Sequence, residues 1–313
     1  MTDISIVLCT YNGKNYIKEQ LNSIYNQTLL PNEIIICDDR STDNTIEIIK
    51  NWIIDKKTSI DIKIIVNEEQ LGPIKNFEKG LLLSRGSYIF FCDQDDIWLP
   101  CKIEKTYTKM KEMETLYGDI PLLVHTDLMV VDKHLRLINY SMFQSQGLKN
   151  AEKYPLKTLL VQNYITGCTM MINKIAKQES LPFPNKIIMH DWWMGLIVAA
   201  TGKIGFINEP TIKYRQHGHN TIGAKKYLSI TNIKKLFQLN KILKGINNII
   251  NQDIAFKEYK CGILKKKDPI IINDIQALSS QNLFYLYNNK IFKQGVLRNI
   301  FFYFFLFIYK LKK

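Results

Sequence analysis

Paired cysteines are missing from this sequence. Six cysteines are dispersed through the 313 residues, and no two of them stand in a Cys-x-x-Cys or similar spacing. This absence argues against a zinc module and against a disulfide framework, because both need closely spaced or paired thiols. Three of the cysteines lie in apolar runs that are typical of strands. We therefore expect reduced thiols that are mostly buried.

A leader segment and a membrane-spanning run are also missing. The first fifteen residues enter a strand-like segment without a charged leader, a long apolar stretch or a small-residue cleavage site. We therefore predict no secretory signal and a cytoplasmic protein. The apolar run of residues 300–309 would extend only about 15 Å as a helix, against a hydrocarbon core of about 30 Å. It is too short to span a bilayer.

Acidic residues are scarce in the last third of the chain. Residues 224–313 contain 17 Lys and Arg but only 4 Asp and Glu, which accounts for the whole net charge of +13. The basic and acidic residues of 1–223 balance. The charge pattern therefore predicts two parts, a balanced domain of residues 1–223 and a basic, helical region of residues 224–313.

The basic region predicts contact with a membrane surface. The apolar and aromatic residues of 300–309 are flanked by Arg298, Lys310, Lys312 and Lys313, which suits a helix lying on an anionic leaflet. Docking of this helix on its own domain, or on a second subunit in a homodimer, is the alternative. No nucleic-acid-binding module precedes the tail, so we expect no nucleic acid partner.

Short apolar runs alternate with stretches of helical periodicity along the first hundred residues. Strands are predicted at residues 4–9, 33–39, 60–66 and 88–92, and helices at residues 15–27, 44–54 and 73–84. This alternation is typical of βαβ units, so the fold class is α/β, with a Rossmann-like, mainly parallel sheet flanked by helices. Further strands are predicted at 122–132, 166–172 and from 211, and a helix at 189–200. In such sheets ligands bind outside the carboxyl ends of the strands.

Three carboxylates, Asp93, Asp95 and Asp96, directly follow the fourth predicted strand. They would repel one another unless a positive group lay among them. Carboxylate oxygens at this spacing suit Mg²⁺ or Mn²⁺, and the open positions of such a cation suit the oxygens of a nucleoside diphosphate. A solvated acidic loop that caps the next helix explains a lone Asp-x-Asp equally well.

Several motifs together resemble glycosyltransferase family 2 over about the first 220 residues. They are SIVLCTYNG, IIICDDRSTDNT, NEEQLGPIKNFEKG, FFCDQDDIWLP, TGC and HDWW, in that order. The variants DQDDIW and YRQHGHN further resemble the rhamnosyltransferase-like branch that builds bacterial surface polysaccharides. The resemblance implies the GT-A fold, a nucleotide-sugar-binding α/β domain.

The resemblance also implies roles for residues near the nucleotide. Thr10, Tyr11 and Asn12 would line its pocket, and Asp39 would accept a hydrogen bond from the pyrimidine base. Lys75 stands where the family often has an arginine near that base.

Other roles concern the cation and the sugar. Asp93 is expected to face the ribose and the metal, Asp95 to bind the metal, and Asp96 to orient the sugar. His217 is expected to reach the diphosphate or to complete the metal shell, with Arg215 as an anion partner. A surface loop is the alternative for both of these residues.

The acceptor side of the site needs a base. Asp191, at the start of a predicted helix, is expected to take the proton from the acceptor hydroxyl, and a helix N-cap is its alternative role. Of the adjacent Trp192 and Trp193, we expect one to stack on a sugar and the other to be buried. Gly167 would allow the backbone to approach the acceptor, or would simply form a turn.

Together these features predict an inverting, metal-dependent hexosyltransferase that uses Mn²⁺ or Mg²⁺. Its donor would be dTDP-L-rhamnose or a UDP-hexose. Its acceptor would be a lipid-linked glycan of capsule, O-antigen or cell-wall synthesis, met at the inner face of the plasma membrane.

Other protein classes are the alternatives. A nucleotidyltransferase would normally have a glycine-rich phosphate loop after the first strand, where this chain has CTYNGKN. A haloacid-dehalogenase-type phosphatase would need Asp-x-Asp-x-Thr there. A non-catalytic carbohydrate-binding protein on the same fold would bind the nucleotide without turning over the donor.

Overall fold

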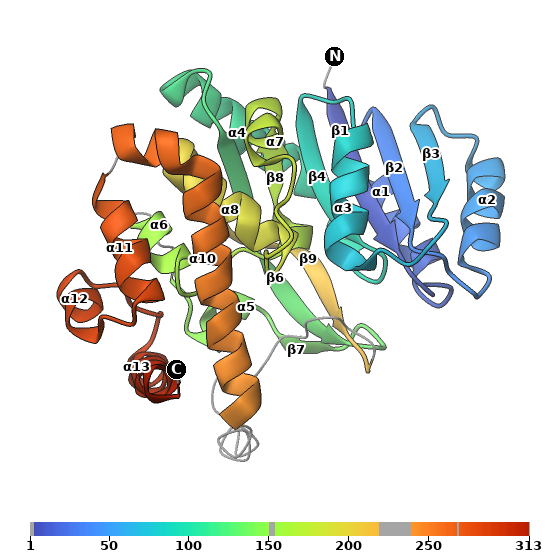
Figure 1. Cartoon of the computed structure of the whole chain (residues 1–313). Coiled ribbons are helices and arrows are strands. Elements are labelled where there is room, and N and C mark those ends of the chain that lie inside the picture. Colours follow the sequence, from blue (N-terminus) through green and yellow to red (C-terminus); the bar gives the residue numbers. More distant parts are fainter. Residues whose placement is uncertain (1–2, 150–153, 219–238, 268, 313) are drawn as a thin grey trace. The chain divides into compact units, whose positions relative to one another are not determined.

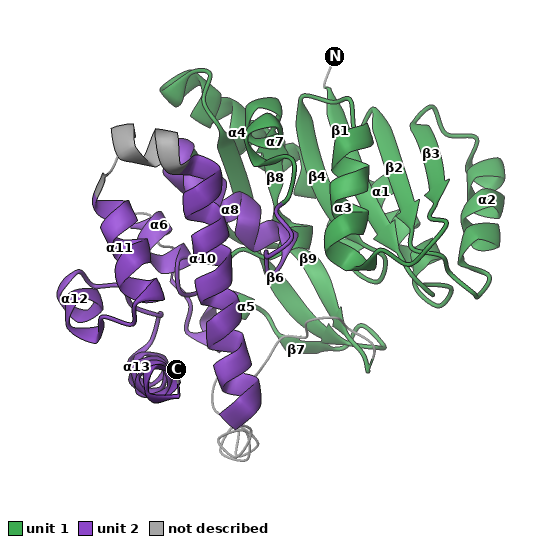
Figure 2. Ribbon diagram, in the orientation of Figure 1, with its two compact units in different colours: residues 1–142, 165–183, 202–224 green, residues 143–164, 184–201, 225–313 purple. Residues whose placement is uncertain are grey.

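The computed structural model describes residues 3–149, 154–218, 239–267 and 269–312, with side chains described outside residues 261–269. Its contacts divide the chain into two compact units (Figure 2). Unit 1 comprises residues 1–142, 165–183 and 202–224, and unit 2 comprises residues 143–164, 184–201 and 225–313. The basic region therefore shares its unit with two segments of the predicted first domain, residues 143–164 and 184–201. The predicted boundary at residues 223 and 224 lies outside the described residues.

Unit 1 is built on a mixed sheet whose first half is parallel (Figure 1). Four strands are parallel, in the order β3, β2, β1 and β4: Asp61–Val66, Glu33–Asp38, Ile4–Thr10 and Tyr88–Asp93. The sheet then continues with β8, β6, β9 and β5: Met171–Asn173, Leu122–Asp132, Lys203–Gln216 and Ile97–Trp98. A short strand, β7 (Leu137–Asn139), pairs with β6. In this second half, β6 and β9 are parallel and the other pairs are antiparallel.

Helices cover both faces of the sheet of unit 1. They are α1 (Ile17–Tyr25), α2 (Thr45–Lys56), α3 (Gly72–Leu83), α4 (Lys102–Tyr117) and α7 (Lys174–Ser180). Because side chains alternate along a strand, Ile4, Ile6 and Leu8 of β1 join the core that contains α1 and α2, whereas Val7 faces α3. Burial on both faces explains why β1, β2 and β4 appear in the sequence as nearly continuous apolar runs, whereas the edge strand β3 is partly exposed.

Unit 2 is helical within the described residues. Its helices are α5 (Met142–Gln146), α6 (Pro155–Leu159), α8 (His190–Thr201), α10 (Leu239–Lys267), α11 (Pro269–Ser279), α12 (Leu283–Asn288) and α13 (Val296–Leu311). Trp193 of α8 is fully buried and packs edge-on against Phe256 and Tyr259 of α10, with ring centroids 6.2 and 5.2 Å apart. None of the helices in the described ranges combines the length and apolarity needed to cross a bilayer.

The structure confirms the first four predicted strands and the three helices between them. Three of the five described cysteine side chains are buried, and all five are free thiols, as predicted. Two local predictions were incomplete. The predicted strand at 166–172 begins only at Met171, after the short 3₁₀ helix η1 (Gly167–Thr169). The two-residue strand β5, which follows the acidic cluster, was not predicted.

Candidate active site

The polar ends of three strands meet at one edge of the sheet of unit 1, as the sequence predicted. Thr10 at the end of β1 is in register with Asp38 at the end of β2, and Cys9 is in register with Asp93 at the end of β4. The segments that follow these strands therefore leave the sheet side by side. This edge contains every predicted nucleotide-contacting residue of the first hundred positions except Lys75.

Hydrogen bonds tie the loops after β1 and β2 together. The Asp38 carboxylate accepts hydrogen bonds from the Thr10 hydroxyl at 2.7 Å and from the Ser41 hydroxyl at 2.6 Å. Asn12 has a positive φ of 50°, which places its side-chain Oδ1 2.8 Å from the amide nitrogen of Thr42. Thr10 is thus a buried support of this edge, whereas Tyr11 and Asn12 are exposed at its surface.

Asp39 is almost fully buried and holds the loop before α3. Its Oδ1 accepts hydrogen bonds from the Asn67 side-chain amide at 2.9 Å and from the Leu71 amide at 2.7 Å, and its Oδ2 accepts one from the Gly72 amide at 2.8 Å. An ionised carboxylate has about four acceptor positions. The described residues fill three of them, so one position remains for a further hydrogen-bond donor.

Lys75 forms an ion pair with Glu78 rather than with Asp39. Its ammonium group lies 2.6 Å from Glu78 Oε2, one turn further along α3, and 3.3 Å from the Phe183 carbonyl oxygen. The lysine that contacts the surroundings of Asp39 is instead Lys79, which donates to Asn67 Oδ1 at 2.9 Å. The sequence did not indicate Lys79.

Gln94 joins the acidic loop, residues 93–96, to the loop after β1. Its side-chain amide pairs with the backbone of Tyr11, accepting from the amide nitrogen at 2.8 Å and donating to the carbonyl oxygen at 2.9 Å. A Cβ atom on Gly13 would lie only 2.2 Å from Gln94 Oε1, so glycine at position 13 makes room for this pairing. The pairing fixes the loop that contains Asp93 and Asp95 to the loop that contains Tyr11.

Asp95 faces His217 from the end of β9. Its Oδ2 lies 2.7 Å from His217 Nε2, and both side chains are about nine-tenths buried. The His217 ring stacks on Tyr16 at the start of α1, with centroids 4.8 Å apart and an interplanar angle of 22°. Strand β5 makes this contact possible, because it pairs the end of the acidic loop with β9.

Arg215 is buried and contacts the acidic loop, whereas the alternative predicted for it was a surface loop. Its guanidinium group donates to the Asp95 carbonyl oxygen at 2.8 Å, forms an ion pair with Glu19, and lies 4.7 Å from the Tyr16 ring centroid. Its backbone amide donates to Asp96 Oδ1 at 3.1 Å. Arg215 therefore fixes both the backbone and the Asp96 side chain of the acidic loop.

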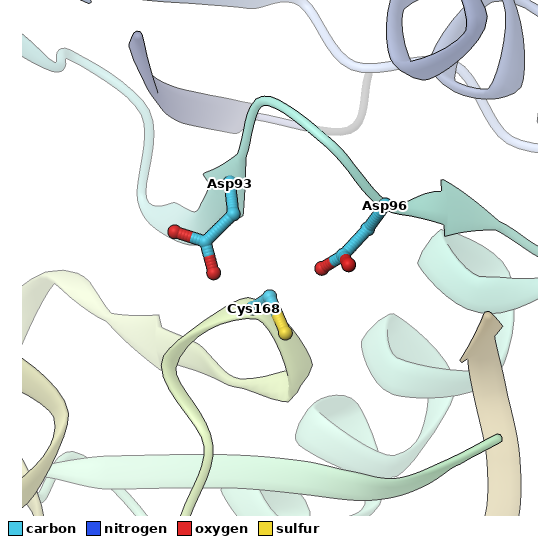
Figure 3. Close-up of side chains that lie close together, drawn as sticks. All are labelled: Asp93, Asp96 and Cys168. Carbon is cyan, nitrogen blue, oxygen red and sulfur yellow. The ribbon is translucent and has the colours of Figure 1, made fainter. Parts of the chain in front are cut away.

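Asp93 and Asp96 converge with Cys168 of η1 (Figure 3). One ligand atom from each of the three lies within 4.8 Å of the others, an arrangement that could hold a metal ion. Asp96 is fully buried, and its Oδ2 has no hydrogen-bond partner among the described residues. Burial raises the pKa of Asp96 well above its ordinary value, and the charges of Asp95 and Asp93 raise it further.

These carboxylates fit a divalent cation. A cation near Asp96 would supply the partner that its buried oxygen lacks and would offset the repulsion from Asp93 and Asp95. The Cys168 thiol contributes less, because burial, followed by the charges of Asp96 and Asp93, raises its pKa well above the ordinary value. Of the predicted metal pair, Asp93 belongs to the converging group with Asp96 and Cys168, whereas the Asp95 carboxylate lies beside His217.

A buried lysine lies below the acidic loop. Lys102, the first residue of α4, is fully buried, with its ammonium group 4.7 Å from the Trp98 ring centroid and 5.2 Å from that of Phe90. Burial lowers the pKa of Lys102 to about 8, while nearby Cys168, Cys92 and Asp96 oppose this shift. No local pattern in the sequence marks this residue, because it resembles an ordinary surface lysine of a helix.

Asp191, in unit 2, lies within the first turn of α8, two positions after the N-cap position. Its Oδ1 accepts hydrogen bonds from the Trp192 amide at 2.6 Å and from the Asn163 side-chain amide at 3.1 Å. Trp192 is partly exposed and donates to the Leu159 carbonyl oxygen at 2.5 Å, whereas Trp193 is buried. The predicted division of the two tryptophans between surface and core is confirmed.

Gly167 belongs to unit 1 and is buried in η1, directly before Cys168. Gly167 thus forms a turn, which was the alternative role predicted for it. His219, the second histidine of the YRQHGHN motif, lies outside the described residues.

Comparisons with known proteins agree with this architecture. The family model described as "Glycosyl transferase family 2" matches residues 5–179. The chain is 30% identical over 277 residues to an uncharacterized glycosyltransferase of Haemophilus influenzae, covering 84% of this chain and 83% of that protein. It is 31% identical over 264 residues to the dTDP-rhamnosyl transferase RfbG of Shigella flexneri, covering 79% and 86%.

A solved structure of similar shape is S. aureus TarS 1–349 in complex with UDP-GlcNAc. It matches with a TM-score of 0.56 at 17% sequence identity and covers 93% of each chain. The sheet and this likeness define the fold as that of the GT-A glycosyltransferases. Within that class, the chain belongs to glycosyl transferase family 2.

Proposed function

We propose that this glycosyltransferase moves a hexose from a pyrimidine nucleotide sugar to a hydroxyl group, with inversion at the anomeric carbon and with the help of Mn²⁺ or Mg²⁺. The observation that carries the proposal is the acidic loop at the sheet edge, where Asp93 and Asp96 converge and Asp95 faces His217. This loop is fixed by Gln94 to Tyr11, beside the segment proposed to bind the nucleotide.

Asp93 and Asp95 would hold the cation, and Asp96 and His217 stand next to them. When bound, the cation supplies positive charge to the diphosphate oxygens, where negative charge develops as the donor breaks down. The chain's own residues orient this loop: Arg215 holds its backbone, and Tyr16 supports the His217 ring. Asp96 would orient the sugar, as the family resemblance implies.

The nucleotide would lie along the loops after β1 and β2. Tyr11 and Asn12 expose their side chains there, and Thr10 supports them from below. The remaining acceptor position of Asp39 would take the N–H group of a uracil or thymine base. Lys75 is proposed near the base from the family pattern, and reaching it would require the side chain to leave Glu78.

Asp191 is proposed as the base. The acceptor oxygen attacks the anomeric carbon, its proton passes to the Asp191 carboxylate, and the bond from the anomeric carbon to the diphosphate breaks with the electron pair leaving on the phosphate oxygen. Asn163 and the Trp192 amide stabilise the ionised carboxylate by donating to Oδ1. Trp192 would stack on an acceptor sugar, and Gly167 would leave room for the acceptor beside the backbone.

The Asp191 assignment has a direct test. Asp191→Asn keeps the size of the side chain but cannot accept the proton, so we expect transfer to fall by at least about a hundredfold. Affinity for the nucleoside diphosphate, measured by calorimetry, should change less than about twofold. Transfer at a substantial fraction of the wild-type rate would refute the assignment.

The names of similar proteins support a role in bacterial surface polysaccharide synthesis. One relative is the dTDP-rhamnosyl transferase RfbG, and another, 28% identical, is the putative teichuronic acid biosynthesis glycosyltransferase TuaG of Bacillus subtilis. We propose dTDP-L-rhamnose or a UDP-hexose as donor and a lipid-linked glycan as acceptor. The enzyme would then act in the cytoplasm, peripherally on the inner face of the plasma membrane.

A thermal-shift panel identifies the donor. The protein is melted with UDP-, dTDP- and GDP-sugars, each with Mn²⁺ or Mg²⁺, because a ligand that binds only the folded state raises the melting temperature. We expect selective stabilisation by one pyrimidine nucleotide sugar in the presence of metal. Equal shifts with GDP-sugars, or none with any donor, would contradict the proposal.

A further inference from the structure

The last helix of unit 2 has an exposed face that is entirely apolar. At 100° per residue, its exposed apolar side chains fall within roughly 140° of the helix circumference. We call these residues the outer face of α13. They are Val296, Leu297, Ile300, Phe301, Phe304, Phe307 and Leu311, which are 43 to 76% exposed.

The opposite face fixes α13 to its own unit. Phe302, Phe305 and Leu306 are buried, and the Tyr309 hydroxyl donates to Asn247 of α10 at 2.6 Å. The Arg298 guanidinium group donates to the Gln146 carbonyl oxygen at 2.6 Å. The helix therefore already has its intramolecular contacts, and docking on its own unit does not cover the outer face.

An apolar stripe of this size on a water-facing helix is typical of an interaction surface. The sixteen residues of α13 extend about 24 Å, which is long enough to lie in a membrane interface but too short to cross about 30 Å of hydrocarbon. We propose that the outer face of α13 inserts into the surface of an anionic lipid bilayer. This deepens the membrane location of the proposed function, and its test does not depend on sugar transfer.

Charge favours a bilayer over a second copy of the chain. Lys310 and Lys312 are exposed, and helical geometry places them near the two margins of the outer face. Residues 224–313 also contain 17 basic and only 4 acidic side chains. Anionic headgroups complement this charge, whereas a second copy would bring the same positive region against it.

The composition of the face points the same way. A large side chain buries roughly 150–250 Å², so seven residues at about half exposure offer roughly 600–1,000 Å², all of it apolar. A stable protein interface buries about 800 Å² on each partner and includes a polar rim. A membrane surface needs no such complementarity, because it accepts an apolar stripe flanked by lysines as it stands.

Vesicle co-sedimentation of the full chain tests the inference. The vesicles contain phosphatidylcholine and phosphatidylglycerol in equal amounts, or phosphatidylcholine alone. We expect the protein to bind the anionic vesicles, and Phe304→Asp with Phe307→Asp to weaken that binding about tenfold or more. Ile54→Asp is the matched control, because Ile54 is 69% exposed on α2, in unit 1, and should leave vesicle binding unchanged.

Two further measurements separate the alternatives. Sedimentation velocity reports whether the outer face joins two copies: a wild-type dimer that the double variant dissociates, without vesicle binding, would overturn the inference. Equal vesicle binding by the wild type and the double variant would also overturn it. Calorimetry of nucleoside diphosphate binding should give the same affinity for both proteins, so a failed donor proposal and a failed membrane proposal are distinguishable.

Discussion

At the scale of single residues, the middle position of the acidic motif has a structural role that the motif itself does not reveal. In the motif DQDD the aspartates are the evident candidates for metal binding, and nothing in the motif assigns a role to the glutamine. The Gln94 amide nevertheless makes two hydrogen bonds with the Tyr11 backbone, above a glycine that leaves it room. These hydrogen bonds hold the loop after β1, which is proposed to bind the nucleotide, at a fixed position beside the acidic loop, which is proposed to bind the cation.

Gln94→Leu should weaken binding of the nucleoside diphosphate. The variant keeps the bulk of the side chain but loses both hydrogen bonds, each worth about 0.5–1.5 kcal/mol, so we expect an affinity about tenfold lower in the presence of Mn²⁺. Gly13→Ala should have a similar effect by displacing the amide. Gly218→Ala is the control, because its Cβ would meet nothing within 4 Å. Wild-type affinity in both test variants, measured by calorimetry, would show that the pairing does not matter.

At the scale of elements, close packing of α3 on the parallel strands positions the Asp39 loop. The amides of Leu71 and Gly72, which bind Asp39, stand at the start of this helix. Gly80 lies against the sheet, where an added Cβ would come within 2.3 Å of Val7 Cγ1 and 3.2 Å of Cys37 Sγ. The helix can approach β1 and β2 this closely only because residue 80 has no side chain.

Gly80→Ala should therefore destabilise the protein, although alanine is the better helix former by about 1 kcal/mol. Overpacking of this kind typically costs about 1–3 kcal/mol, so the melting temperature should fall. Gly245→Ala, in α10, is the matched substitution in open space, and we expect it to raise the melting temperature or leave it unchanged. A rise for Gly80→Ala would show that α3 can move away from the sheet without loss.

Elements with strong local patterns were predictable from the sequence, whereas contacts between distant segments were not. The apolar runs of β1, β2 and β4 and the helical spacing of α1 and α3 indicated the parallel half of the sheet. Strand β5 has only two residues and pairs with β9 more than a hundred positions away. Its pairing brings Arg215 and His217 to the acidic loop, so the support of that loop could not be derived from local patterns.

The same distinction applies to the candidate site. The sequence indicated Asp93, Asp95 and Asp96 because like charges at the end of a buried strand need a partner. It did not indicate that Asp39 holds the Leu71 and Gly72 amides, or that Lys102 is buried beneath the loop. Both facts depend on how the loops and α4 close over the sheet edge. Burial of a charged side chain has no local signature.

At the scale of the whole molecule, each unit has a histidine whose burial disfavours protonation of its ring. His125 lies in β6 of unit 1, with its ring centroid 4.8 Å from that of Phe206, and His190 begins α8 of unit 2. Burial lowers the pKa of each from its ordinary value of 6.5 to about 3. Below pH 6.5 these two histidines therefore bind protons in the unfolded chain but not in the folded units.

Through these two histidines, acid should destabilise both units, whereas Asp96 and Asp253, whose pKa values are raised by burial, act in the opposite direction. The histidines cost no stability above pH 6.5, and each lowers the free energy of unfolding by about 1.4 kcal/mol for each pH unit between 6.5 and 3. The melting temperature is measured from pH 7 to about pH 4.5 for each protein, because the contribution of one histidine appears as a difference between variants. His125→Phe, which keeps a ring beside Phe206, should lose less stability on acidification than the wild type, and His134→Asn, at an exposed position, should lose as much. Equal losses for all three proteins would contradict the prediction.

The central claim is that the aspartates of the acidic loop hold a divalent cation that binds the donor diphosphate. Calorimetric titration of UDP and dTDP, with Mn²⁺ and after its removal by a chelator, tests it directly on the wild type and on Asp95→Asn. We predict that metal removal lowers the affinity of the wild type by about a hundredfold, as expected for loss of a cation that neutralises the diphosphate. Asp95→Asn should show the weak affinity with or without Mn²⁺. Equal affinity under all four conditions would contradict the claim.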